Sequence, residues 1–461
     1  MTSVARAEVP GAPGPKRALW FGRLLEAQRD PLAFFERMIG EHGDYVGIRF
    51  GPVRYLVVND ADGVRRLLVD NHRNYTKSRN YEALKLVLGE GLLTSEGDFW
   101  MRQRRLAQPA FHKERLASFV RMMISDTRGM LGRWRDADDG RPFDVHHEMM
   151  RLTLRIVTRT LFSTDSDADA DAVGKAMTVA LEHVNDYADS LVRVPPWVPT
   201  PKNLRFGRAR RTLDALVLRI IDARRKSKDP PNDLLSMLMS AEDEETREQM
   251  TDRQLRDEVM TLVAAGHETT ANTLTWTFYL LSQHPAAAER LRREVDSVLG
   301  GRPPSFEDLS RLVFTRSVLE ESLRLYPPAW IIERQAIAED CIGGYRVPRA
   351  TVVAVSPYFL HRHRRYWENP REFDPDRFSA GAAPRPKYAY LPFGGGPRLC
   401  IGNAFALMEA QIILAMVAAD WALELAPGFS VELDPSVTLR PRRGLFMTRK
   451  PTSDPRPARA I

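Results

Sequence analysis

The stretch FGGGPRLCIG, residues 393–402, decides the fold that we predict for this chain. Its three consecutive glycines let the backbone adopt turn conformations and approach a flat ligand closely. Cys400 lies just before a helical pattern that begins at Asn403, where unpaired N–H groups and the helix dipole stabilise a thiolate. Arg398 precedes the cysteine by two residues and can hold a negative group on the same ligand. A single thiolate opposite an open face is the arrangement of a haem-thiolate iron.

This loop resembles the haem-binding loop of the cytochrome P-450 family, whose pattern is Phe-x-x-Gly-x-Arg-x-Cys-x-Gly. Five residues match the pattern: Phe393, Gly396, Arg398, Cys400 and Gly402. The resemblance implies haem b (iron protoporphyrin IX) as the cofactor, with Cys400 as the metal ligand. It also places Phe393, Arg398 and Gly402 beside the cofactor. The alternative interpretation is a glycine-rich turn that contains a structural cysteine.

A long helical pattern covers residues 252–283, and a helix of this length measures ~45 Å. Its middle reads AAGHETT, in which small residues such as Ala265 allow a flat cofactor to approach closely. Threonine hydroxyls can bond back to helix carbonyls and bend the helix. In the family, an acid followed by a threonine at this place activates oxygen. The resemblance thus implies that Glu268 relays protons and that Thr269 holds dioxygen by hydrogen bonds; the alternative is an ordinary surface glutamate.

A tryptophan and an arginine four residues apart share one face of an earlier helical pattern. An indole N–H and a guanidinium that point the same way suit a carboxylate. The family places such a pair at a haem propionate, together with two further arginines. The propionate partners implied by the resemblance are Trp100, Arg104, Arg334 and Arg398. A Trp-x-x-x-Arg pair is common by chance, so its position in the chain carries most of the weight.

A helical pattern over residues 309–325 contains an acid and an arginine three residues apart, which can pair. The family combines such a pair with a later arginine in a buried cluster behind the haem loop. The corresponding residues are Glu321, Arg324 and Arg377. The implied role of this cluster is structural.

The resemblance also implies a substrate pocket with a mostly apolar lining. Its candidate residues are Leu86, Leu92, Leu93, Ala329, Trp330, Ile331 and Thr438. The alternative for the apolar members is an ordinary place in the core.

Composition excludes several other classes of protein. The chain has 461 residues, 43% of them hydrophobic and 28% charged, as in globular proteins. Its two cysteines, Cys341 and Cys400, are too few for a disulfide framework or a four-cysteine zinc site. We find neither a signal peptide nor a run of ~18 apolar residues, and therefore expect a cytoplasmic protein without a membrane anchor.

The net charge of +7 has two interpretations. One is a basic docking face for an acidic redox partner. Its candidate residues are Arg102, Arg105, Lys113 and Arg115. The other is a compositional bias that leaves a solvated basic surface. Nucleic-acid binding is not expected, because no basic helix or zinc motif supports it.

The resemblance extends from about residue 31 to residue 450. It implies a mainly α fold with a small β-rich region, and haem between the long helix and the Cys400 loop. We expect one domain over residues 17–450, disordered ends at 1–16 and 451–461, and a monomer.

The implied activity is hydroxylation or epoxidation of a lipophilic small molecule, such as a fatty acid or a terpenoid, with O2. Electrons then come from a separate ferredoxin or flavodoxin and its reductase, because the chain is too short for a fused reductase. Two alternatives are a haem-thiolate enzyme that uses peroxide or rearranges its substrate, and a non-enzymatic haem sensor or ligand-binding protein.

Overall fold

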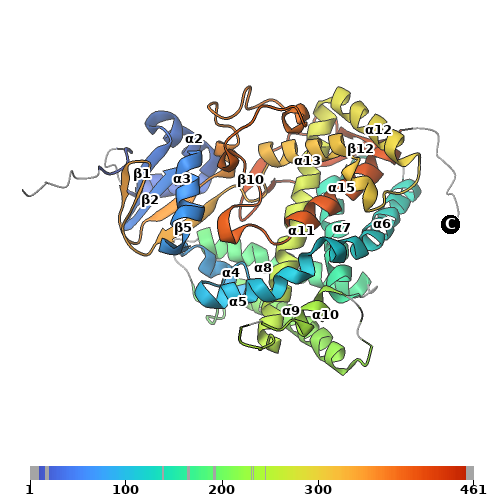
Figure 1. The fold of residues 1–461 in the computed structure, drawn as a ribbon, viewed down its shortest axis with the longest axis horizontal. Helices are drawn as coiled ribbons and strands as arrows, with labels where there is room; N and C mark the ends of the chain where they lie inside the picture. The colour runs from blue at the N-terminus through green and yellow to red at the C-terminus, as the bar shows by residue number, and fades with distance from the viewer. Residues whose placement is uncertain are drawn as a thin grey trace, which may run out of the picture. The chain divides into compact units, whose positions relative to one another are not determined.

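The computed structural model describes residues 10–15, 20–137, 140–163, 167–189, 194–229, 231, 233–243 and 245–452 (Figure 1). They form two compact units, which we treat separately. The first consists of the described residues within 1–81, 329–372 and 383–400, and the second of those within 82–328, 373–382 and 401–461. Helices dominate and the sheets are small, which confirms the predicted mainly α fold with a small β-rich region.

A five-stranded sheet organises the first unit. Its strands are β1 (Tyr45–Phe50), β2 (Val53–Val58), β3 (Tyr75–Lys77), β5 (Ile332–Ala336) and β8 (Val352–Val355). They lie in the order β1-β2-β8-β5-β3, with β2 and β8 parallel and the other pairs antiparallel. Gly51, with a φ of 60°, supports the tight β1–β2 turn. Buried aliphatic side chains such as Leu56, Ile332 and Val353 join strands that lie far apart in the sequence.

Helices and a hairpin complete this unit. They are α1 (Trp20–Arg29), α2 (Pro31–His42), α3 (Ala61–Arg65), β6 (Asp340–Ile342), β7 (Tyr345–Val347) and α14 (Pro357–Leu360). Asp30 caps α2 by accepting the Ala33 N–H at 3.0 Å.

The two predicted disordered ends are described only in part. Residues 10–15 run beside strands, since the Pro13 carbonyl accepts the Gly47 N–H at 2.7 Å and the Pro10 carbonyl accepts the Arg346 N–H at 2.9 Å. Pro451 is the last residue of β12 (Phe446–Pro451). The remainder of these predictions, residues 1–9, 16 and 453–461, lies outside the described residues.

Helices form most of the second unit. They are α4 (Tyr81–Leu88, of which the first residue belongs to the first unit), α5 (Gly97–Ala107), α6 (Lys113–Asp136), α7 (Val145–Phe162), α8 (Asp167–Asp189), α9 (Pro201–Lys226), α10 (Leu234–Ser240), α11 (Asp252–Gln283), α12 (Pro285–Leu299), α13 (Val313–Leu325) and α15 (Asn403–Asp420). Two small sheets accompany them, β4 (Phe143–Asp144) with β12 and β9 (Trp421–Leu425), and β10 (Leu433–Pro435) with β11 (Leu439–Pro441).

The central helix α11 fixes the arrangement of this unit. Thr251 and Gln254 form a capping box at its start, and Pro285 follows its end. The helix packs against α7, α9, α13 and α15 and is buried over most of its length (Figure 1).

Among the described helices, α15 alone has the length and apolar composition to cross a membrane. Within this unit it lies in the hydrophobic core, where its side chains from Ile412 to Ala415 are fully buried. These contacts account for its apolar composition.

Candidate functional site

The cysteine loop closes on itself through its backbone. The Cys400 N–H donates to the Phe393 carbonyl at 3.0 Å, and the Leu399 N–H donates to the Gly396 carbonyl at 3.1 Å. Gly396 has a φ of 65°, and a Cβ there would lie 1.9 Å from the Leu68 carbonyl oxygen, so the loop requires glycine at this position. Cys400 and Leu399 are both exposed. The loop thus presents one thiol on an open face.

The donors present fit a haem iron better than a bare metal ion. A protein that holds a metal ion in a cage of its own side chains usually supplies three or four ligands. Over the described part of the chain, no group of three or more His, Cys, Asp or Glu side chains could hold a metal. A haem iron is bound by its macrocycle and needs only one axial side chain from the protein, such as a Cys thiolate.

The central helix has an open position in its middle. Ala265 is exposed, and Gly266 and Thr269 are half-buried, whereas Ala264 and Thr270 beside them are buried. The Thr269 hydroxyl donates to the Ala265 carbonyl at 2.7 Å. The exposed side chain at this position is only a methyl group, which leaves room for a planar group, and the lone pairs of the Thr269 hydroxyl can still accept a hydrogen bond.

Glu268 ends a chain of hydrogen bonds within the second unit. Its Oε1 accepts the Thr438 hydroxyl at 2.6 Å, and Thr438 accepts from Asn272 Nδ2 at 3.0 Å. Asn272 Oδ1 lies 3.0 Å from His146 Nε2, which must carry the proton because Oδ1 can only accept. Arg440 Nη1 lies 4.0 Å from the same Glu268 oxygen. Each donor in the chain therefore points toward the Glu268 carboxylate.

The sequence analysis did not predict most of this chain of hydrogen bonds. It placed Thr438 among the pocket residues and gave no role to Asn272, His146 or Arg440. Asn272 could have been found, because it follows Glu268 by four residues on one helix face. His146 and Arg440 lie far away in the sequence and carry no local signal.

Comparison with known proteins decides the family. A family model described as cytochrome P450 matches residues 12–450. The chain belongs to the cytochrome P450 family. It is 39% identical over 421 residues to cyclooctatin synthase of Streptomyces melanosporofaciens, with 91% of each chain covered. It is 37% identical over 419 residues to cyclooctat-9-en-7-ol 5-monooxygenase of the same organism, with 90% of each chain covered.

A solved structure agrees with this assignment. The crystal structure of the cytochrome P450DA heme domain matches with a TM-score of 0.88 at 27% identity, over 96% of this chain and 98% of that one. This cytochrome P450 is therefore a monooxygenase, an oxidoreductase whose cofactor is haem. The predicted family, fold, enzyme class and cofactor are confirmed.

The structure brings the predicted acid–arginine cluster of this P450 together. Arg324 Nε and Nη2 donate to the two Glu321 carboxylate oxygens at 2.6 and 2.7 Å. Arg377 Nε lies 3.4 Å from Glu321 Oε1, which also accepts the Asp374 N–H at 2.8 Å. The side chains of Glu321 and Arg324 are 0% exposed. An acid this deeply buried requires such partners.

The predicted partners of the haem carboxylates lie on separate elements. Trp100 is buried and Arg104 half-buried on α5. Arg334, on β5, is half-buried and donates to the Glu333 carbonyl at 2.9 Å. Arg398 belongs to the short 3-10 turn of the cysteine loop. The adjacent Glu333 carboxylate accepts hydrogen bonds from Tyr55, Ser78 and Asn80 at 2.6 to 2.7 Å.

The predicted pocket residues differ in burial. Ala329 is exposed, Leu86, Leu93 and Ile331 are half-buried, and Leu92, Trp330 and Thr438 are buried. The Thr438 hydroxyl is already engaged by Glu268 and Asn272. The backbone carbonyl of Trp330 accepts the Ser356 hydroxyl at 2.6 Å.

The predicted basic helix face is partly neutralised. Arg105 Nη2 lies 3.0 Å from an Asp243 carboxylate oxygen and 2.9 Å from one of Glu245, and Arg102 Nη2 lies 3.0 Å from one of Glu248. These acids all belong to the loop that precedes α11. Two of the four predicted docking residues are thus ion-paired within the unit, which favours the solvated-surface interpretation for them.

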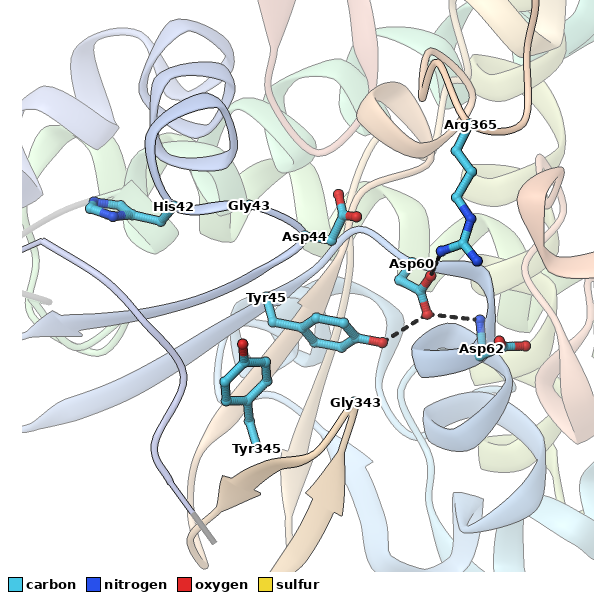
Figure 2. Close-up of a pocket in the computed structure, with 9 residues that line it drawn as sticks. All are labelled: His42, Gly43, Asp44, Tyr45, Asp60, Asp62, Gly343, Tyr345 and Arg365. Carbon is cyan, nitrogen blue, oxygen red and sulfur yellow. Dashed lines mark hydrogen bonds and ion pairs between the residues drawn. The ribbon is translucent and has the colours of Figure 1, made fainter.

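The cavity in Figure 2 belongs to the first unit and contains none of the predicted site residues. It measures about 470 Å³ and is lined by polar groups that bind one another. Asp60 accepts the Tyr45 hydroxyl at 2.7 Å, the Asp62 N–H at 3.1 Å and the Tyr366 hydroxyl at 2.8 Å, and Arg365 lies 3.5 Å away. This network fixes the start of α3 to the sheet, and we assign it a structural role.

Proposed function

We propose that this cytochrome P450 hydroxylates or epoxidises a lipophilic terpenoid, with electrons from a separate ferredoxin or flavodoxin and its reductase. The relatives named cyclooctatin synthase and cyclooctat-9-en-7-ol 5-monooxygenase favour a terpenoid over a fatty acid. The observation that carries the proposal is the open position at Ala265 on α11, three residues before the acid–threonine pair of Glu268 and Thr269. The enzyme acts as a cytoplasmic monomer.

Haem, when bound, supplies the activation of O2 and the oxidation of the substrate. We assign the Cys400 thiolate to its metal and Phe393 and Gly402 to the adjacent loop surface. The carboxylate groups of the cofactor are assigned to Trp100, Arg104, Arg334 and Arg398. The cluster of Glu321, Arg324 and Arg377 supports the fold and makes no contact with substrate.

Residues of this protein hold and deliver the protons that the reaction needs. Thr269 donates to the Ala265 carbonyl, so its hydroxyl oxygen accepts a hydrogen bond at the open position. Thr438 holds Oε1 of Glu268, which leaves Oε2 to carry a proton. Arg440 lies 4.0 Å from Oε1, and the half-buried His146 is connected to this oxygen through Asn272 and Thr438. Glu268 then supplies protons, and Thr269 orients the group that receives them.

The acid–threonine pair distinguishes this function from its alternatives. A haem-thiolate enzyme that uses peroxide or rearranges its substrate needs no proton delivery to reduced oxygen, and a haem sensor needs no catalytic acid. Neither alternative gives a catalytic role to the hydrogen-bonded chain from His146 to Glu268.

The first experiment is the carbon monoxide difference spectrum of the reduced, purified protein. We expect a Soret band at the position of thiolate-ligated haem, which Cys400→Ala should lose while Cys341→Ala retains it. A histidine-type band in fresh protein contradicts the assignment of Cys400. Substrate-dependent NADH oxidation with a ferredoxin and its reductase then tests the monooxygenase; activity with peroxide alone would favour the first alternative.

A further inference from the structure

The first half of α11 carries two buried oxygen atoms that have no hydrogen-bond partner among the described residues, Glu258 Oε1 and Thr261 Oγ1. Glu258 is 1% exposed and Thr261 4%. Residues three apart lie on one side of a helix. Buried polar atoms in proteins nearly always have a partner, so this pair requires an explanation.

Thr261 differs from the later threonines of the same helix. Five of them donate to the carbonyl four residues earlier, at 2.7 to 3.1 Å: Thr269, Thr270, Thr273, Thr275 and Thr277. The Thr261 hydroxyl instead lies against the turn before Leu92. A Cβ on Gly91 would come within 2.1 Å of it, so only glycine allows this approach.

Glu258 is only half satisfied. Its Oε2 accepts the Leu92 N–H at 3.0 Å. Its neighbour Asp257, by contrast, binds Arg256 Nη1 at 2.8 Å and the Glu90 N–H at 2.9 Å. Burial raises the pKa of Glu258 to about 8, with the Leu92 N–H opposing and Asp257 adding to the effect. At neutral pH the side chain is therefore mostly protonated, and Oε1 can donate a hydrogen bond.

The two oxygens share a helix face with the open position. Thr261 precedes Ala265 by four residues, and Glu258 precedes it by seven. At 1.5 Å per residue, Glu258 lies ~10 Å from Ala265 along the helix axis. Leu92 and Leu93, predicted pocket residues, follow the turn that covers the pair. The polar pair and the open position thus lie on one side of the helix, with the pair beneath the turn and close to Leu92.

We propose that Glu258 and Thr261 bind a hydroxyl group that the substrate already carries, so that the enzyme acts on an alcohol and not on the parent hydrocarbon. A hydroxyl both donates and accepts, which matches a protonated acid beside a threonine hydroxyl. An earlier oxidation or hydration must then install this group, and the second oxidation falls ~10 Å from it along the helix. The inference rests on the proposed function and names its substrate class.

The test compares the binding of alcohols and hydrocarbons to the purified holoenzyme. Farnesol and farnesene form one matched pair. Cyclohexanol and methylcyclohexane form a second pair of smaller molecules, which tests the hydroxyl group independently of a terpenoid carbon skeleton. We expect the alcohol to bind about tenfold more tightly, as one buried hydrogen bond allows. Thr261→Val and Glu258→Leu should bring the ratio of the two affinities close to one. The tighter binding of the alcohol should be preserved in Glu258→Gln, which keeps a hydrogen-bond donor. It should also be preserved in Thr275→Val, the matched control.

Infrared spectroscopy gives a readout independent of turnover. A protonated-carboxyl band that is lost in Glu258→Gln should shift when cyclohexanol binds and remain unchanged with methylcyclohexane. Equal affinities for both members of each pair, or an unchanged preference in Thr261→Val, overturn the inference. If the enzyme shows no preference for alcohols but still has the thiolate-type spectrum and oxidises farnesene with its redox partner, the proposed function stands. Only the assignment of an alcohol substrate then fails.

Discussion

The Thr438 hydroxyl donates a 2.6 Å hydrogen bond to the Glu268 carboxylate, across 170 residues of sequence. Both residues are buried, at 6% and 7% exposure, within one compact unit. A charge-assisted bond of this kind is short and strong, so it fixes the position of the acid. The turn between β10 and β11 thereby becomes part of the apparatus that we assign to proton delivery.

Thr438→Val tests this relationship, because valine keeps the shape and removes the donor. We expect product formed per NADH to fall several-fold and hydrogen peroxide release to rise, because a misplaced acid delivers protons to the wrong place. Thr178→Val, which removes an exposed hydroxyl bound to the Gly174 carbonyl, is the control. The assignment is wrong if both variants couple NADH oxidation to product as the wild type does.

The sequence predicted the features that local pattern determines. The cysteine loop requires glycines at fixed spacing, and α11 requires a long apolar pattern with a cap, so both could be recognised within ten to thirty residues. Contacts between distant segments leave no such mark. The ion pair of Arg105 with Asp243 and the contact of Leu92 with Glu258 each depend on how helices and turns pack. The ion pairs of Arg102 and Arg105 in the predicted docking face were therefore not foreseen, and the buried acid Glu258 was missed.

Glu321→Gln should be among the most destabilising single substitutions in the second unit. It leaves the fully buried Arg324 guanidinium without a counter-charge, and breaking a buried pair in this way costs about 3–5 kcal/mol. Thermal unfolding of the holoenzyme measures the loss, and haem release at moderate temperature should accelerate with it. Glu320→Gln, one residue earlier at a partly exposed i,i+4 pair, should change stability by less than about 1 kcal/mol. Similar losses in both variants would contradict the structural role of the cluster.

Gly396→Ala should prevent normal formation of the cysteine loop. The new Cβ would meet the Leu68 carbonyl oxygen at 1.9 Å, and the φ of 65° adds about 1–2 kcal/mol of strain. We expect a folded protein with much reduced haem content and a weakened thiolate-type spectrum. Gly381→Ala, where a Cβ meets nothing within 4 Å, is the control. Full haem incorporation in Gly396→Ala would show that the loop relaxes around the added methyl group.

Glu258 makes stability depend on pH in a direction opposite to that of most carboxylates. Burial raises its pKa to about 8, whereas glutamate in an unfolded chain has a pKa of ~4.3. The folded state therefore binds this proton more tightly, and its contribution to stability is complete below about pH 4 and lost as the pH rises toward 8. Glu258→Gln removes this dependence. The free energy of unfolding of Glu258→Gln minus that of wild type should therefore increase between pH 5 and pH 8, by on the order of 3 kcal/mol.

Urea unfolding at pH 5, 6.5 and 8 measures this difference. Asp257, the carboxyl group beside Glu258, is present in both proteins, and its charge is part of the reason why the pKa of Glu258 is raised. Glu424→Gln, which removes an exposed partner of Lys450, should shift stability by a small amount that does not vary over this range. If Glu258→Gln and wild type keep a constant difference from pH 5 to 8, Glu258 is ionised throughout. It could not then donate a hydrogen bond to a substrate alcohol, and Thr261 alone would have to bind the hydroxyl group.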